Sequence, residues 1–471
     1  PGNPQLAPVG GYVINFTAAT TAARTVTITG NNNIITTNSV LVGGVLTDAI
    51  FKIIGSDFVT IQNFNMQENI LNITTAAASN DMTEGGVALL YASTTNGAQN
   101  NTIRNNTIRL NRSYSNTFGI YSNTRHSSFN VLVTADATST NGANSSNKIY
   151  GNTINEVNMG IAIIGSGNAA AMDLGNDIGG TSAVTGNTVL GWGGITAATA
   201  FAGNPPVGFG CYGIISNNQK NENISFNNIL SGTLSGTPVD IRGIYKSFNT
   251  VPTGTFTSSI TNNTITIDHV YASGILQGIR SEGISSSVAG ATINITNNRL
   301  EDISVSGTGT TTEIIGISNS SFSGTLNIND NIFRDNFSSA PTAGFTAIDN
   351  SGGANVAINI NNNKIGDATG NAILFFTGSQ PTLVRGINNN TAPGTGATLS
   401  ISGNNFQGFI QNTAAASGYV FIECLRQGNV APSVTGINSN TFTNLSINSS
   451  GNVTFIRRTG PMSLNAGITD N

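Results

Sequence analysis

A short phrase returns along most of this chain and constrains its fold more than any other feature. It consists of an apolar residue, two further residues, an Asn, one residue and a second apolar residue. Residues 293–300 contain one copy, in which alternating apolar positions run into an Asn pair. Such alternation is typical of a short β-strand, and the Asn pair is typical of a turn. Further copies occur at residues 103–108, 149–154, 184–189, 224–229, 260–265, 328–333, 360–365, 401–406 and 437–442.

A second phrase, Gly followed by a short apolar strand, alternates with the first. Copies of the first phrase lie 32 to 46 residues apart, which fits one coil of a solenoid with three short strands and turns of variable length. No segment of a dozen residues has the period of a helix, so the sequence predicts an all-β chain of roughly a dozen coils. The second phrase occurs at residues 119–121, 160–163, 213–215, 243–245, 278–280 and 316–318, with looser copies at 347–349 and 372–374.

The composition agrees with a folded repeat array. Charged residues make up 8% of the chain and the net charge is −4, and apolar residues interrupt the polar tracts at short intervals, which argues against disorder. A repeat array extends one continuous core, so the length does not demand several domains. We expect an N-terminal lead-in segment over residues 1–24 and a single solenoid domain over residues 25–471, with a Gly/Ala/Pro-rich insertion near residues 190–210.

Several coils also resemble a known architecture. Residues 59–63, 293–298 and 358–363 resemble coils of the right-handed parallel β-helix of the pectin-lyase-like superfamily, and most of all its long, Asn-rich members from bacterial surfaces. The resemblance covers roughly residues 25–471 and implies the fold. It implies little about activity, because the same coil serves lyases, hydrolases, adhesins and structural fibres.

The repeated Asn residues are expected to form a structural stack. Asn tolerates the left-handed backbone region that a corner needs, and its amide both donates and accepts hydrogen bonds. Asparagines at one corner of successive coils, about 4.8 Å apart, can therefore bond to the coils on either side. The predicted stack is Asn106, Asn152, Asn187, Asn227, Asn263, Asn298, Asn331, Asn363, Asn404 and Asn440.

Catalytic and metal-binding patterns are weak. Polysaccharide hydrolases that resemble this architecture carry Asn-Thr-Asp, Asp-Asp, Gly-His-Gly and Arg-Ile-Lys signatures, and this sequence contains none of them. Residues 266–270 faintly resemble the Trp-Ile-Asp-His segment of pectate lyases, but Thr replaces the Trp and no carboxylate cluster offers a calcium site. We interpret Asp268 and His269 as a polar corner and His126 as a solvent-facing loop residue. The sequence favours a non-enzymatic protein without catalytic residues, metal or cofactor.

Three other residues stand out by rarity. Trp192, the one tryptophan, begins the insertion and either packs that insertion against the coils, the favoured interpretation, or stacks on a sugar. Cys211 and Cys424 lie about six coils apart, too far for a disulfide. We expect two free, buried thiols.

The second phrase predicts one outward-facing column. If each Ile after the Gly points inward, the next residue points outward, which stacks Tyr121, Ala162, Ile215, Tyr245, Arg280, Ser318 and Asp349. Tyr245, Arg280 and Asp349 are candidates for a glycan-binding strip, although an ordinary solvated face is favoured. Arg280 and Asp349 lie two coils apart and cannot form an acid/base pair. Thr-rich faces also suggest ice binding, but the irregular coil lengths predict no regular Thr array.

Charge and hydropathy limit the partners. No basic cluster exceeds Arg457-Arg458, which argues against nucleic acid, and no apolar run approaches the roughly 18 residues of a membrane span. The low Lys content and neutral polar surface favour an extracellular prokaryotic protein. The chain begins at Pro1, as expected of a mature or partial chain.

The ends of a parallel solenoid suggest how it would function. They expose unpaired strand edges, and neither end of this sequence shows an amphipathic cap. Either flanking sequence is missing or neighbouring subunits cover the edges in a head-to-tail filament. We therefore expect a secreted structural protein: a surface fibre, sheath or adhesin stalk that self-associates. The alternative is a carbohydrate-binding or lyase-type protein that acts on an extracellular glycan through Tyr245, Arg280 or His269.

Overall fold

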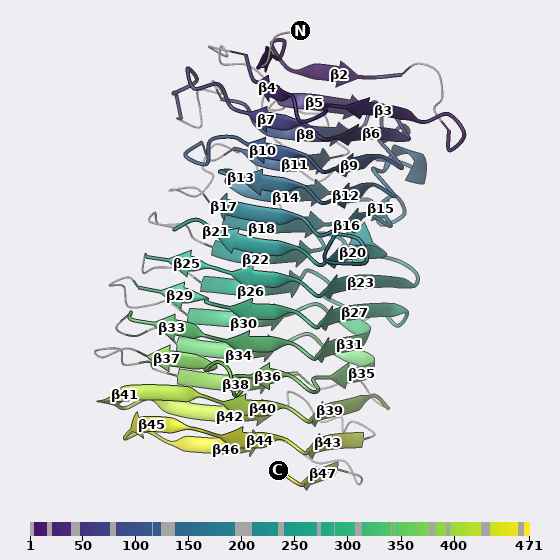
Figure 1. Ribbon diagram of the computed structural model, residues 1–471. Coiled ribbons are helices and arrows are strands. Elements are labelled where there is room, and N and C mark those ends of the chain that lie inside the picture. The colour runs from purple at the N-terminus through teal and green to yellow at the C-terminus, as the bar shows by residue number, and fades with distance from the viewer. Residues whose placement is uncertain are drawn as a thin grey trace. The chain divides into compact units, whose positions relative to one another are not determined.

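The protein is an all-β parallel solenoid (Figure 1). The computed structural model describes residues 4–16, 21–38, 48–75, 82–114, 116–123, 137–193, 210–233, 240–270, 275–286, 288–306, 313–340, 342, 344–375, 381, 383–391, 396–424, 434–459 and 466–471. Within them the single helical segment is the 3₁₀ turn Thr140–Gly142. The predicted fold class, a right-handed parallel β-helix with three parallel sheets, is confirmed.

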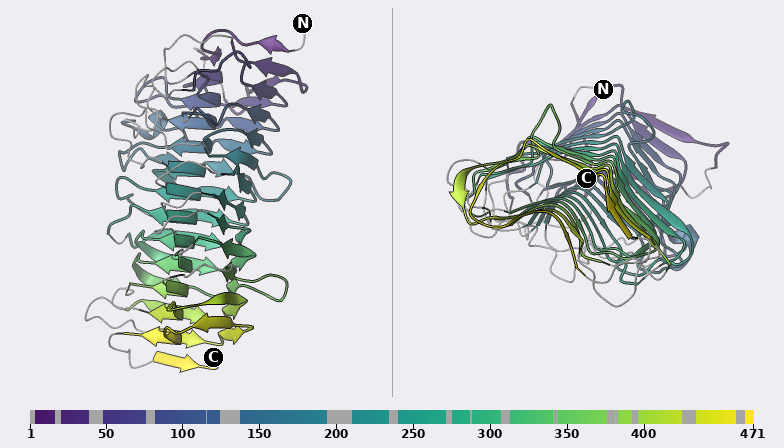
Figure 2. Two further views of the ribbon diagram at one scale, coloured as in Figure 1. Left: turned by 90° about the vertical axis from the view of Figure 1, so that its left-hand side faces the viewer. Right: turned by 90° about the horizontal axis from the view of Figure 1, so that it is seen from below.

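The chain divides into two compact units, one made of Pro1–Gly232 with Ile244–Pro252 and the other of Thr233–Gly243 with Thr253–Asn471. In each unit the strands of three parallel sheets, here called sheets I, II and III, follow one another in every coil (Figure 2).

Sheet I of the first unit consists of β1 (Gln5–Leu6), β4 (Ile34–Thr36), β7 (Asn65–Gln67), β10 (Thr107–Arg109), β13 (Thr153–Asn155), β17 (Thr188–Trp192) and β21 (Asn228–Ser231). Sheet II consists of β2 (Tyr12–Ile14), β5 (Ala49–Ile54), β8 (Gly85–Leu90), β11 (Phe118–Asn123), β14 (Met159–Ile164), β18 (Gly210–Asn217) and β22 (Asp240–Ser247), which belongs to this unit from Ile244 on. Sheet III consists of β3 (Val26–Thr29), β6 (Val59–Gln62), β9 (Thr102–Arg104), β12 (Lys148–Tyr150), β16 (Asp177–Ile178) and β20 (Glu222–Ser225). A small additional sheet pairs β15 (Asp173–Leu174) with β19 (Gln219–Lys220).

Sheet I of the second unit consists of β24 (Thr264–Thr266), β28 (Arg299–Glu301), β32 (Ile332–Arg334), β36 (Lys364–Ile365), β40 (Asn405–Gln407) and β44 (Thr441–Thr443). Sheet II consists of β26 (Ile275–Glu282), β30 (Glu313–Asn319), β34 (Gly344–Asn350), β38 (Leu383–Asn389), β42 (Gly418–Cys424) and β46 (Val453–Arg458). Sheet III consists of β23 (Phe256–Thr261), β27 (Ala291–Thr296), β31 (Ser323–Asn329), β35 (Ala354–Asn359), β39 (Thr398–Ser402), β43 (Val434–Asn438) and β47 (Ala466–Thr469). Sheet IV, found in this unit, consists of β25 (Asp268–His269), β29 (Ser304–Val305), β33 (Asn336–Ser338), β37 (Ile373–Phe375), β41 (Phe409–Ala415) and β45 (Ser446–Ser449).

Two features differ from the sequence expectation. Strands β1 and β2 pair with β4 and β5, so the lead-in segment already belongs to the solenoid. Coils of the second unit carry a fourth strand, where the sequence predicted three strands and a turn. Four of the six, β25, β29, β33 and β37, are only two or three residues long, too short for an alternating pattern to show in the sequence. Residues 194–209 of the expected insertion lie outside the described residues.

Columns of aliphatic side chains fill the interior. In sheet III of the first unit Ile61, Ile103, Ile149, Ile178 and Ile224 pair in successive strands and are at most 2% exposed. Burying each such side chain contributes about 1.5–3 kcal/mol relative to an exposed position. The apolar ends of the repeated phrase therefore form the core.

The Gly of the second phrase is required by close packing between sheets I and II. A Cβ at Gly278 would lie 2.2 Å from Leu300 Cδ2 and 2.7 Å from the carbonyl oxygen of Gly316 in the next coil. Equivalent contacts meet Gly119 and Gly160 in the first unit. Since any side chain would displace both a core residue and the neighbouring coil, the phrase marks the closest approach of the two sheets.

The two residues of the Asn corner have different structural roles. The residue before the stacked Asn has the left-handed backbone, with φ values of 57° at Asn262 and Asn297 and 59° at Asp330. The stacked Asn itself does not appear in that region. The first residue of the pair turns the chain, and the second is left to bond the coils together.

Candidate functional site

The asparagines singled out from the sequence are joined in a hydrogen-bonded ladder within each unit. Every stacked Asn is at most 1% exposed. Within a ladder, Oδ1 accepts from the backbone N–H and from Nδ2 of the preceding ladder residue, as between Asn106 and Asn152. Nδ2 also donates to a carbonyl oxygen of the previous coil, as in Asn152 and Asn298. The Nδ2 to Oδ1 distances are 2.9–3.1 Å along Asn106, Asn152, Asn187 and Asn227 in the first unit. They are 2.8–3.1 Å along Asn263, Asn298, Asn331, Asn363, Asn404, Asn440 and, beyond the predicted set, Asn471 in the second.

The side-chain amide of each ladder residue thus forms its hydrogen bonds with neighbouring coils. A buried amide without partners costs about 1–3 kcal/mol, whereas a satisfied one stabilises modestly. Since the ladder amides are committed, they offer little to a ligand.

Two further ladders escaped the sequence prediction. In the first unit Asn101 and Asn147 donate their backbone N–H groups to Oδ1 of Asn147 and Asn176, at 2.9 and 2.8 Å. In the second unit Asn319 Nδ2 donates to Asn350 Oδ1, and Asn350 Nδ2 to Asn389 Oδ1, at 2.9 and 2.7 Å. The second of these has a sequence signal, an Asn three residues after the Gly or Ala of residues 316, 347 and 386.

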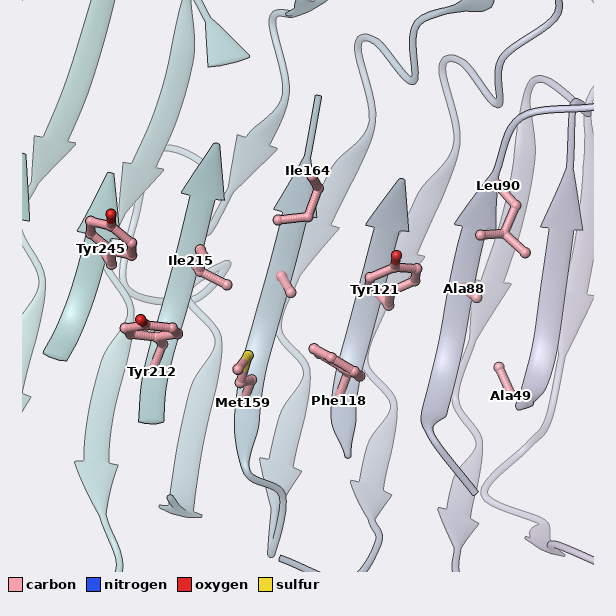
Figure 3. Packing of buried hydrophobic residues seen from close by; sticks show 11 residues of the cluster. Ala49, Ala88, Leu90, Phe118, Tyr121, Met159, Ile164, Tyr212, Ile215 and Tyr245 are labelled. Atoms are coloured by element: carbon pink, nitrogen blue, oxygen red, sulfur yellow. The ribbon is translucent and has the colours of Figure 1, made fainter. Parts of the chain in front are cut away.

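The predicted outward column exists in register but is buried in the first unit. Tyr121 pairs with Ala162, and Ala162 with Ile215. These residues and Tyr245 are 0–4% exposed and belong to an apolar cluster with the aromatic residues Phe118 and Tyr212 (Figure 3). The rings of Tyr212 and Tyr245 lie 5.2 Å apart. The expectation of a solvated face is therefore wrong here, because the outward residues of sheet II form an apolar cluster shielded from solvent, and Tyr245 is not open to a glycan.

In the second unit the same column is polar, and its side chains form hydrogen bonds with other residues of the protein. Arg280 pairs in register with Ser318, and Ser318 with Asp349. The Arg280 guanidinium donates to Glu282 at 2.8 Å and to Ser320 at 3.0 Å, and also to Ser318. Asp349 accepts from Asn388 at 2.8 Å. The structure thus does not bring Arg280 and Asp349 together around a shared free space.

A buried charge cluster, unseen in the sequence, lies in the first unit. Lys246 Nζ is 2.7 Å from Glu222 Oε1, donates to the carbonyl of Gln219 and lies 4.1 Å from the centre of the Phe248 ring. Burial lowers the pKa of Lys246, which Glu222 opposes. Nearby Asp173 accepts from Gln219 Nε2 at 2.9 Å, and burial raises its pKa to about 7. Because Lys246 is 1% exposed, this cluster serves packing between coils rather than a solvent-borne ligand.

A groove of about 800 Å³ borders sheet I of the first unit, where Ile70, Ile73, Arg109 and Glu68 contribute to its lining. Glu68 is not available to a ligand, because its carboxylate accepts from Thr37, Asn69, Asn72 and Thr83 and so holds the loop that carries Ile70.

The remaining sequence candidates are structural where they are described. Asp268 accepts from Thr233 and Ser304, both at 2.9 Å. His269 follows it in β25, and His126 lies outside the described residues. Trp192 is fully buried.

Both cysteines are free and buried. Burial raises the pKa of the Cys424 thiol to about 12, which leaves it an inert thiol at neutral pH.

Within the described ranges, no three His, Cys, Asp or Glu side chains lie together as a metal site would require. The same part of the chain has no helix long and apolar enough to cross a membrane. No protein-family model matches the chain, and no curated protein matches it either.

Proposed function

We propose that this protein is an extracellular structural β-solenoid, a subunit of a surface fibre, sheath or adhesin stalk that assembles through its coil ends. The observation that carries the proposal is the asparagine ladder, in which buried amides bond each coil to the next at 2.8–3.1 Å. Such a ladder makes coils mutually dependent and rigid. The proposal includes kinship with the Asn-rich bacterial members of the pectin-lyase-like superfamily, supported by the repeated coil phrases.

Exposed apolar side chains at the last coil support assembly through an end. Phe455 in β46 packs on Phe421 and Phe442, with ring centres 5.5 and 5.2 Å apart, yet it is 48% exposed. Val453 and Ile468 in the same coil are 43% and 45% exposed. Unpaired strand edges beside apolar side chains are templates for another chain. We assign them to a further coil, supplied by a neighbouring subunit in a head-to-tail contact or by chain beyond residue 471.

Light scattering and negative-stain electron microscopy of the purified chain test this proposal. We expect concentration-dependent oligomers or fibrils, and Phe455→Asp should abolish them. Val356→Asp is the matched control, because Val356 is 55% exposed in β35, away from the last coil. A monodisperse monomer without fibrils, or equal assembly by both variants, would contradict it.

The alternative, a carbohydrate-binding or lyase-type protein acting on an extracellular glycan, has less support because Tyr245 is buried and Arg280 is committed to Glu282 and two serines. Release of unsaturated products from acidic polysaccharides, followed by absorbance and lost in Arg280→Ala, would establish it instead.

A further inference from the structure

One face of the second unit differs from all others in chemistry. The outward positions of sheet III are occupied by small uncharged residues, none of them aromatic. Outward positions of sheets I and II in this unit carry charges, among them Arg299, Glu301, Arg334 and Arg385. The outward residues of sheet III that stand in register, with their continuation at Asn361, are here called the hydroxyl-amide face: Thr257, Ser259, Thr261, Thr292, Asn294, Thr296, Thr325, Asn327, Asn329, Ala357, Asn359, Asn361, Thr398, Ser400, Ser402, Gly436, Asn438, Gly467 and Thr469. At its margin, the bulged start of β35 also exposes Asn355 and Val356.

These residues form columns in strict register. All six residues of β23 pair in order with those of β27, and residues 292–296 of β27 with residues 325–329 of β31. The column of Asn294 and Asn327 continues through Asn359, Ser400, Gly436 and Gly467. The single register shift, between Ser323 and Thr325, lies before the first column.

The irregular coil lengths that argued against a regular Thr array do not disturb the register of this sheet, although its columns mix Thr with Ser, Asn, Ala and Gly. The variable residues lie in the connections, and the strands of sheet III stack along one side of the unit (Figure 1). Successive residues of one column lie about 4.8 Å apart from coil to coil, and neighbouring columns lie about 6.7 Å apart along a strand. The result is a two-dimensional lattice of hydroxyl and amide groups, interrupted at Ala357, Gly436 and Gly467.

Several side chains on this face are already ordered. Asn327 Nδ2 donates to Asn294 Oδ1, and Asn359 Nδ2 to Asn327 Oδ1, both at 2.8 Å. Further along, Ser400 donates to Asn361 Oδ1 at 2.9 Å. Because these bonds fix rotamers before any ligand arrives, binding would cost little side-chain entropy.

The chemistry of the face selects its partner. Sugars are usually held by aromatic stacking together with a few polar groups, and nucleic acids by basic groups; the hydroxyl-amide face has neither. A periodic, uncharged lattice of donors and acceptors instead matches a solid that is itself such a lattice, namely ice. Threonine methyl groups between the hydroxyls limit competing liquid-like hydration, and a charged side chain would impose its own hydration shell.

We propose that the hydroxyl-amide face binds ice. This activity goes beyond the scaffold role and requires no self-assembly, because each unit of the lattice is complete within one chain.

Ice-crystal microscopy and a recrystallisation assay on the full chain test the proposal. Thr325→Lys places a charge in the middle of the face, and Thr264→Lys makes the same change at an outward, half-buried position of sheet I. We expect the wild-type protein and Thr264→Lys to facet ice crystals and suppress recrystallisation, and Thr325→Lys to lose both effects. Circular dichroism melting of both variants verifies that the fold is retained.

Three outcomes would overturn the proposal. The wild-type protein could leave crystals round and recrystallisation unchanged, or both variants could behave alike. Wild-type binding to microcrystalline cellulose or chitin without any effect on ice would assign the face to a glycan. Neither variant touches Phe455 or the last coil, so the assembly test and this test can fail independently.

Discussion

Asn298 and Asn331 share a hydrogen bond in which Asn298 Nδ2 donates to Asn331 Oδ1 at 3.1 Å, while Asn298 Oδ1 accepts from Asn263 at 3.0 Å. Asn298 Nδ2 also donates to the carbonyl of Ile260 at 2.9 Å. Asn298→Ala would remove the acceptor of the buried Asn263 backbone N–H and the side-chain donor to the Ile260 carbonyl, whereas Asn331 Oδ1 would keep the backbone N–H of residue 298. At about 1–3 kcal/mol for each of the two groups, we expect a loss of at least about 2 kcal/mol in urea unfolding.

The adjacent Asn297 provides the control. Its φ is 57° and it is exposed, so Asn297→Gly keeps the corner without strain. We expect Asn297→Gly to change the free energy of unfolding by less than about 0.5 kcal/mol. Equal losses in the two variants would show that the corner, not the ladder, is what stabilises the coil.

The asparagines illustrate what the sequence could predict. Each ladder member is a local pattern repeated in every coil, so its place follows from spacing alone. The division between the turning Asn297 and the bonding Asn298 depends on backbone angles, which the Asn pair does not distinguish. The register of Thr292 on Thr325 could not be predicted, because coil length is set by connections as well as strands.

Long-range burial was the least predictable property. Tyr121 and Tyr245 occupy outward positions by alternation, yet they are 4% and 3% exposed in an apolar cluster on that face. Lys246 and Glu222 read as ordinary surface charges in sequence, although only the packed coils bring them to 2.7 Å. The alternation of residues along a strand predicts on which face of the sheet a side chain lies, but it does not predict which residues cover that face.

Gly278→Ala tests the close approach of sheets I and II. The added Cβ would meet Leu300 Cδ2 at 2.2 Å and the Gly316 carbonyl oxygen at 2.7 Å. We expect a loss of about 1–3 kcal/mol in the free energy of unfolding. Gly418→Ala is the matched control in the same sheet, since the nearest atom, Leu383 Cδ1, is 3.6 Å away. A Gly278→Ala protein as stable as Gly418→Ala would refute this account of the second phrase.

The pair of Lys246 and Glu222 can be tested by a double-mutant cycle. Lys246→Met leaves the buried Glu222 carboxylate without its counter-charge, and Glu222→Gln leaves the ammonium likewise. We expect each single variant to lose about 3–5 kcal/mol in urea unfolding and the double variant to lose much less than the sum. Additive losses would mean that the two side chains stabilise the coils independently.

Glu84 makes stability depend on pH in the direction opposite to ordinary acid denaturation. Its carboxylate accepts from the Tyr114 hydroxyl at 2.9 Å and from the Asp48 backbone N–H at 3.0 Å. Burial raises the pKa of Glu84 well above its usual value, and neighbouring Asp48 raises it further. The folded protein therefore keeps a proton that the unfolded chain releases near pH 4.5.

The sign of the effect follows from proton linkage. Where the native state binds more protons than the unfolded state, the free energy of unfolding falls as pH rises. The contribution of Glu84 is thus complete below pH 4.5 and is lost as pH rises through its folded pKa. Urea unfolding at pH 5 and pH 8 should show a smaller difference for Glu84→Gln than for the wild-type protein, because the amide cannot ionise. The Asn297→Gly variant is the control and should keep the wild-type pH dependence. If Glu84→Gln shows the same difference in unfolding free energy between pH 5 and pH 8 as the wild-type protein, Glu84 is not the source of that pH dependence.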